Sequence, residues 1–124
     1  MLKHAPLIEV IFEIKWQQQE SASLNITYRN PEAVKAFMAA RPQIIPFIEA
    51  AAPVLTKYFG QPLEIVLEVV SYPEEGAEDD LIGWIQSYDE VEEGLNKLEQ
   101  FEDEWFLDHM AEVDYRFNFN LKTR

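Results

Sequence analysis

Two stretches of the chain alternate apolar and polar side chains with the two-residue period of a half-buried β-strand. In residues 113–122 and in residues 8–16 every second side chain is apolar or aromatic. We therefore expect two strands of one sheet, and a shorter alternation over residues 24–29 predicts a partner strand. In the C-terminal strand the side chains predicted to face the core are Val113, Tyr115, Phe117, Phe119 and Leu121. The predicted common core places Phe12, Ile14, Phe117 and Phe119 beneath Leu95, Leu98 and Trp105.

Two further apolar segments, residues 63–72 and 81–88, predict a pair of strands joined by a hairpin loop. Residues 73–80 between them are too polar for anything but an exposed turn. Both strands are apolar on both alternation phases, so one phase can pack against helices while the other leaves apolar side chains on the open face. Exposed patches of this kind usually mark an interface. The candidate anchors on that face are Tyr72, Ile82, Trp84 and Tyr88.

This open face has two interpretations. It either forms a twofold contact between two copies of the chain or docks a partner, because aromatic residues are enriched in interface cores. Alternatively, residues 17–29 or a chain terminus cover it within the molecule.

The helices are predicted from proline positions and from apolar spacing. Residues 30–32, Asn-Pro-Glu, are a typical helix start, and the helix that they open is interrupted at Arg41 and Pro42. A second helical segment covers about residues 43–59. Pro53 lies inside it, and proline removes one backbone hydrogen bond, so we expect a kink or a break there.

A third helix is predicted after Asp89, whose side chain can cap it, with Glu92 completing a capping-box-like pattern. Apolar side chains recur at spacings of three and four residues along this helix, which predicts a single buried stripe. The stripe consists of Val91, Leu95, Leu98, Phe101 and Trp105.

The order of these elements indicates an α+β fold. Without the short strand at residues 24–29, the order is β-α-β-β-α-β, the arrangement of ferredoxin-like folds. We expect an antiparallel or mixed sheet with helices on one face, in a single domain over residues 1–124.

The charge of the chain is concentrated in one region. The formal net charge is −13, and 17 of the 23 acidic residues lie between residues 61 and 112, where Lys97 is the only lysine or arginine. A concentrated negative field repels nucleic acid and anionic lipid and favours basic partners. We therefore expect a basic protein as the partner, and we expect no direct binding of nucleic acid and no binding to a membrane.

The amino-acid composition excludes further kinds of site and a membrane-spanning segment. The chain has no cysteine, which excludes disulfides, thiolate metal sites and a cysteine nucleophile, and which suits a reducing cytoplasm. The most apolar stretch, residues 44–55, is interrupted by two prolines and an acid and is too short to span a bilayer. No signal peptide is visible. We expect a cytoplasmic protein.

The residues that could carry chemistry are few. The two histidines are His4 and His109, and the second stands beside Asp108 near Glu104 and Glu112. Acids at i and i+4 together with an imidazole could hold a metal ion, whereas the alternative is a solvated helix end. We assign no cofactor, no metal and no catalytic residue, and we do not expect an enzyme.

Two short stretches resemble uncharacterised bacterial proteins. Residues 4–14, with the run PLIEVIFEI, resemble the opening of a sporadically distributed bacterial family. Residues 91–107, with the pattern L-x-x-L-x-x-F-x-x-E-W, are similar to a helix of small bacterial hypothetical proteins. These resemblances imply a bacterial or phage origin, and they imply no activity, ligand or catalytic residue.

The sequence thus favours a small acidic protein-binding module that engages or neutralises a basic partner, as an antitoxin, an immunity protein or an inhibitor would. The residues expected to bind the partner lie on the outward side of the acidic helix, at Glu90, Glu93, Glu104 and Asp108. The first alternative is a non-catalytic structural or regulatory subunit of a bacterial complex. A metal- or small-ligand-dependent enzyme is the second.

Overall fold

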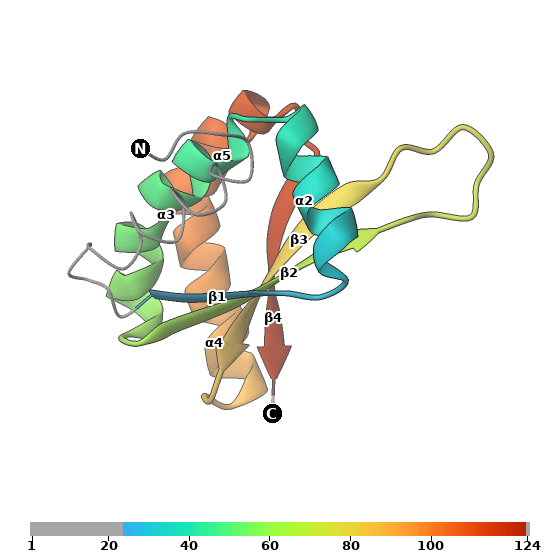
Figure 1. Cartoon of the computed structure of the whole chain (residues 1–124). Helices are drawn as coiled ribbons and strands as arrows, with labels where there is room; N and C mark the ends of the chain where they lie inside the picture. The colour runs from blue at the N-terminus through green and yellow to red at the C-terminus, as the bar shows by residue number, and fades with distance from the viewer. Residues whose placement is uncertain (1–23, 124) are drawn as a thin grey trace, which may run out of the picture.

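A four-stranded sheet and the helices packed on it make up the part of the chain that the structure describes (Figure 1). This computed structural model describes residues 24–123. The strands are β1 (Leu24–Tyr28), β2 (Leu63–Val70), β3 (Asp80–Ser87) and β4 (Phe117–Thr123). The helical elements are α2 (Pro31–Ala40), α3 (Ile44–Phe59), α4 (Val91–Phe101), a π turn (Glu102–Phe106), α5 (Leu107–His109) and a 3₁₀ turn (Met110–Val113).

The strands lie across the sheet in chain order, β1-β2-β3-β4. The β1/β2 and β3/β4 pairs are parallel, and the β2/β3 pair is antiparallel. Parallel neighbours need a helical crossover, which α2 and α3 provide for the first pair and α4 for the second. The α+β class with a mixed sheet is therefore confirmed, and the sheet is open. The ferredoxin-like order is not confirmed, because each strand here pairs with its neighbour in sequence.

The short segment that the ferredoxin-like interpretation left out is β1, the first strand of the described sheet. Residues 24–28 therefore extend the sheet and do not cover its open face. The predicted strand at residues 8–16, with Phe12 and Ile14, lies outside the described residues.

The core uses one alternation phase of each strand. The strand residues in the core are Leu63, Ile65, Leu67, Leu81, Ile85, Phe117 and Phe119. Residues of the opposite phase, such as Val66, Trp84 and Asn118, lie on the open face and are half-buried. Alternation thus predicted the buried side of β2, β3 and β4 correctly, because that side is the one against which the helices pack.

The first two helices begin where the proline pattern predicted. Pro31 is the first residue of α2, although the side chain of Asn30 makes no capping hydrogen bond. Pro53 lies inside α3, which continues unbroken to Phe59, so the expected break does not occur. The fully buried neighbours Ala51 and Leu55 hold the helix in place on both sides of the proline.

The predicted buried stripe of the third helix is wrong in its first turns. Val91 and Leu95 are 55% and 50% exposed. A Cβ placed on Gly94 would lie 3.0 Å from Ser87 Oγ and 3.1 Å from Leu121 Cδ1, so the helix approaches the sheet through its glycine. The line of contact therefore passes through Gly94 and leaves Val91 and Leu95 to one side.

The two ends of this helical region also differ from the prediction. Glu90, not Asp89, occupies the N-cap position of α4. After Phe101 the π turn places Phe106 in the core, and Trp105 is half-buried. A π turn takes about one residue more than an α turn, which shifts the faces of the residues that follow.

The segment before β4 departs from the predicted strand. Val113 is buried in the 3₁₀ turn, and Asp114 and Tyr115 then adopt positive φ angles of 55° and 58°. These two left-handed residues reverse the chain, and Tyr115 ends 57% exposed, not in the core. The strand begins only at Phe117.

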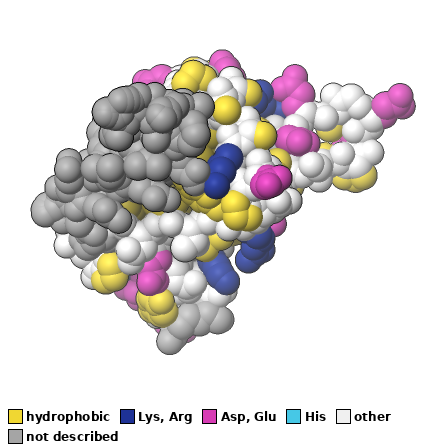
Figure 2. Space-filling view, in the orientation of Figure 1, with side chains coloured by type: hydrophobic (Ala, Val, Ile, Leu, Met, Phe, Trp, Pro, Cys, Tyr) yellow, Lys and Arg dark blue, Asp and Glu magenta, His cyan; other side chains and the backbone are white. Residues whose placement is uncertain are grey.

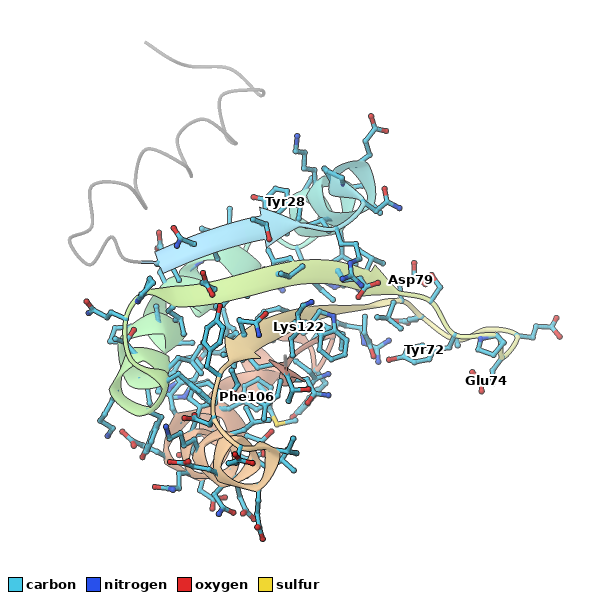
Figure 3. All side chains as sticks on the ribbon, turned by 90° about the horizontal axis from the view of Figure 1, so that it is seen from below. Tyr28, Tyr72, Glu74, Asp79, Phe106 and Lys122 are labelled. Atoms are coloured by element: carbon cyan, nitrogen blue, oxygen red, sulfur yellow. The ribbon has the colours of Figure 1, made fainter. Side chains whose placement is uncertain are left out.

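The loop between β2 and β3 projects away from the body of the protein (Figure 1). Residues 71–79 are all exposed, as the acidic composition predicted, whereas Asp80, the last residue of the predicted loop, is buried and begins β3. Glu74 lies towards the tip of this loop, and Tyr72 lies closer to its base (Figure 3). Within residues 24–123, no helix combines the length and the apolar character that crossing a membrane requires.

Candidate protein-interaction surface

The acidic helical region from Glu90 to Glu112 presents most of its carboxylates to solvent. Of the four residues predicted to bind a partner, Glu90, Glu93, Glu104 and Asp108, all are exposed. They are not equivalent, because Glu93 and Glu104 have basic partners within the chain. Among residues 24–123, Glu93 and Glu104 thus take part in ion pairs, whereas no ion pair is seen for Glu90 and Asp108.

Glu104 joins the π turn to α3. Lys57 Nζ lies 2.7 Å from both carboxylate oxygens of Glu104, and the Tyr58 hydroxyl donates a hydrogen bond to the same carboxylate. The hydrogen bonds from Lys57 and Tyr58 lower the pKa of Glu104, and the hydrogen bond to Glu104 raises the pKa of Lys57 and of Tyr58. Glu104 is thus engaged by α3 within the chain.

Lys97 pairs with two of the acids at the start of α4. Its ammonium lies 2.9 Å from Asp89 Oδ2 and 3.9 Å from Glu93 Oε2. Asp89 therefore acts as an ion-pair partner across two helical turns, not as the predicted cap. Among the described residues, the acids of this region for which no ion pair with lysine or arginine is seen are Glu90, Glu92, Glu99, Glu102, Asp103, Asp108 and Glu112.

Glu102 lies in the middle of this uncompensated group and is half-buried. Burial raises the pKa of Glu102, and the neighbouring charges of Asp103 and Glu99 raise it further. Both causes disfavour the carboxylate, so a cation brought to this position would relieve an existing electrostatic cost.

His109 is held against Trp105. The two rings stack with centroids 4.2 Å apart, and His109 Nδ1 lies 2.7 Å from the Trp105 carbonyl oxygen. A carbonyl can only accept, so Nδ1 carries the proton in this contact. Within residues 24–123 no group of three or more histidine, aspartate or glutamate side chains is arranged to hold a metal ion. The residues Asp108 and Glu112 are exposed and do not form such a group with His109.

The four predicted anchors of the sheet face do not form one patch. Ile82 and Trp84 lie on the open face of β3 and are half-buried, whereas Tyr72 and Tyr88 lie beyond its opposite ends. Trp84 Nε1 donates to Glu68 Oε1 at 2.9 Å, so the polar edge of the indole is already satisfied. Lys122 of β4 also lies on this side of the sheet (Figure 3).

The tyrosines at the two ends are likewise bonded to acids. The Tyr88 hydroxyl donates to Glu64 Oε1 at 2.9 Å, and the Tyr72 hydroxyl donates to Asp80 Oδ2 at 2.9 Å. The hydrogen bond to Asp80 raises the pKa of Tyr72. The open face is therefore a mixed polar and apolar surface, and its apolar part is smaller than the sequence predicted.

Arg116 anchors the base of the projecting loop. Its guanidinium lies 3.1 Å from Asp80 Oδ1 and 3.2 Å from Glu78 Oε1. These contacts tie β4 to the start of β3, and sequence patterns did not reveal them because the partners are separated by more than 30 residues in the chain. Figure 2 shows further acidic side chains at the tip and near the base of this loop.

No protein-family model, curated protein or solved structure gives a significant match to this chain. The functional argument therefore rests on the surface itself.

Proposed function

We propose that this chain is a small protein-binding module that engages a basic protein through the exposed acids of α4 and of the turns that follow it. The observation that carries this proposal is the group of acids around the half-buried Glu102 for which the described residues show no ion pair with lysine or arginine. A basic partner would neutralise these acids, and their field would attract it over a distance. An antitoxin, an immunity protein or an inhibitor acting in the cytoplasm fits such a surface.

Charge reversal on the helix tests the proposal. The variant Glu92→Lys/Glu99→Lys/Asp103→Lys changes three exposed acids for which the described residues show no basic partner. Glu104 is left intact, because its reversal would also break the contact with Lys57. The matched control, Glu74→Lys/Glu75→Lys/Asp79→Lys, makes the same change of net charge on the projecting loop.

The measurement is the dissociation constant for a partner recovered with the immobilised wild-type chain, at low and at high salt. We expect the helix variant to weaken binding by about tenfold or more and the loop variant to weaken it much less, because close charges act more strongly than screened distant ones. Binding should also weaken with salt. Equal effects of both variants would remove the helix as the site, and no effect of either variant or of salt would overturn the proposal. Far-UV circular dichroism checks that both variants fold.

A twofold contact through the sheet face is a second proposal. It is supported by the register of the sheet, in which Val66 of β2 pairs with Trp84 of β3 on the open face. Ile82, two residues before Trp84 on β3, lies on the same face and diagonally across from Val66. Sedimentation of the wild type and of Trp84→Glu tests it. A monomer that Trp84→Glu does not change would contradict the contact.

A further inference from the structure

Three of the large hydrophobic side chains that are exposed lie on one side of the helical region. Val91 and Leu95 are one turn apart on α4, and Glu102 follows Leu95 by seven residues, which is two turns of an α-helix. The Leu107 N–H then donates to the Glu102 carbonyl across the π turn, so Leu107 is stacked one turn beyond Glu102. We call Val91, Leu95, Glu102 and Leu107 the outer stripe.

The π turn is what keeps this stripe continuous. Leu107 is 54% exposed, similar to Val91 and Leu95, and all three flank a side chain that is charged and half-buried. If the same residues formed an ordinary α-helix, Leu107 would lie five residues after Glu102 and on a different side, because each residue turns the helix by about 100°.

The outer stripe lies on the side of the helical region away from α3. The contacts with α3 come from Glu104, through Lys57, and from Trp105, whose ring centroid is 5.0 Å from that of Phe47. The first turns of α4 lie against Leu121 of β4, the last strand of the described sheet. The stripe therefore borders the edge of the sheet and not its middle.

The charges around the outer stripe indicate which kind of chain could bind to it. Glu92, Glu99 and Asp103 border it, so a second copy of the chain would bring like charges together across a twofold axis. Residues 1–23 of the same chain carry two lysines and three glutamates, a formal charge of −1, and offer no net positive charge. A separate basic chain matches both the acids and the apolar side chains.

We infer that the outer stripe docks an amphipathic basic helix of the partner protein, with aliphatic side chains on Val91, Leu95 and Leu107 and a lysine or arginine on Glu102. This inference rests on the proposed function and adds to it the surface and the class of partner segment. Counted from Val91, the stripe places its side chains at i, i+4, i+11 and i+16, in one row along which the i, i+3, i+4 and i+7 side chains of an amphipathic helix can pack.

The test uses two synthetic peptides and the full chain. The first peptide is a leucine–lysine helix of about 18 residues with its leucines on one face, and the second is a scrambled peptide of the same composition. Fluorescence anisotropy gives the dissociation constants. We expect the amphipathic peptide to bind at least about tenfold more tightly than the scrambled one, because only it can bury leucine against the stripe.

Variants locate the contact. Leu95→Ser/Leu107→Ser should weaken the binding of the amphipathic peptide by about tenfold or more, and Glu102→Gln should weaken it by about fivefold or more. The controls are Tyr115→Ser, an exposed aromatic that is not part of the stripe, and Glu74→Gln on the projecting loop, both of which should bind like the wild type. Chemical-shift changes in the ¹⁵N-labelled chain should fall on the stripe and not on residues 71–79.

Four other results would contradict the inference, and each would point to a different explanation. Equal binding of both peptides, unaffected by the stripe variants but weakened by Glu92→Lys/Glu99→Lys/Asp103→Lys, would remove the stripe and leave the proposed function standing. A wild-type dimer that Leu95→Ser/Leu107→Ser dissociates would identify a second copy as the occupant. A lower melting temperature of that variant without a change in binding would show that the chain itself covers the stripe. If neither peptide binds and the acid reversals leave partner binding unchanged, both proposals fall.

Discussion

Phe119 lies against Gly83 on the neighbouring strand, so closely that a Cβ on the glycine would be 3.1 Å from Phe119 Cδ1. The same Cβ would lie 3.2 Å from Phe117 Cζ, so two rings occupy the space above this glycine. Gly83→Ala should therefore destabilise the fold by about 1–3 kcal/mol, as overpacking does. Urea denaturation measures the change. Combining Gly83→Ala with Phe119→Leu should recover part of the loss, and additive effects of the two changes would contradict the direct contact.

Phe117 is a central member of the aromatic core. It is fully buried, and its ring centroid lies 4.9 Å from that of Phe119 and 5.8 Å from that of Phe47. Phe117→Ala should lower the free energy of unfolding by about 3–5 kcal/mol, because it removes buried area and leaves a cavity. Tyr115→Ala, at an exposed position two residues earlier, should change it by no more than about 0.5 kcal/mol. Similar losses for the two variants would place Phe117 outside the core.

The contact between Lys57 and Glu104 should contribute to stability in a way that depends on salt and on pH. A double-mutant cycle with Lys57→Met and Glu104→Gln should give a small favourable coupling energy that decreases at high salt, because solvent screens an exposed ion pair. The pKa of Glu104 is lowered in the folded state, so its contribution is complete above the ordinary value of 4.5 and is lost as the pH falls through the folded value. A coupling energy that is the same at neutral and at strongly acidic pH would contradict the ion pair.

Glu102 should have the opposite effect on stability. Its pKa is raised in the folded state, so the folded chain binds its proton more tightly than the unfolded chain does. The resulting stabilisation is complete below the ordinary value of 4.5 and is lost as the pH rises through the folded value. At neutral pH Glu102→Gln should therefore stabilise the fold slightly, because solvent screens a carboxylate that is only partly buried.

Thermal unfolding of Glu102→Gln and of the wild type across this pH range provides the check. The difference between them should shrink as the solution is acidified. Glu112→Gln, an exposed acid on the 3₁₀ turn, is the control and should show little pH-dependent gain. A destabilised Glu102→Gln at neutral pH would show that the carboxylate makes a favourable contact within the chain.

Much of the sheet could be predicted from the sequence, because alternation depends only on which side of a strand is buried. It located β2, β3 and most of β4, whose buried residues all belong to one phase. The order of the strands could not be predicted in this way, since pairing depends on which crossover each helix makes. The short strand β1 illustrates this, because its alternation predicts a strand but does not predict the parallel pairing with β2.

The helical region was harder to predict for two physical reasons. Counting apolar side chains assigned Val91 and Leu95 to the core, whereas the closest approach to the sheet is made by Gly94, which has no side chain to count. A period of 3.6 residues also cannot locate a π turn. The exposure of the acids was predictable from composition, but the engagement of Glu104 by Lys57, 47 residues earlier, required the tertiary structure.

The π turn makes the helical region tolerant of one particular deletion. Removing the exposed Asp103 would shorten the step from Glu102 to Leu107 from five residues to four, which is the step of an ordinary α-helical turn. Leu107 would then stay one turn beyond Glu102, in the row of Val91 and Leu95. Adding a residue there would instead rotate every later side chain by about 100°. An insertion at this point, and not a deletion, should therefore exchange the surface that the helix offers.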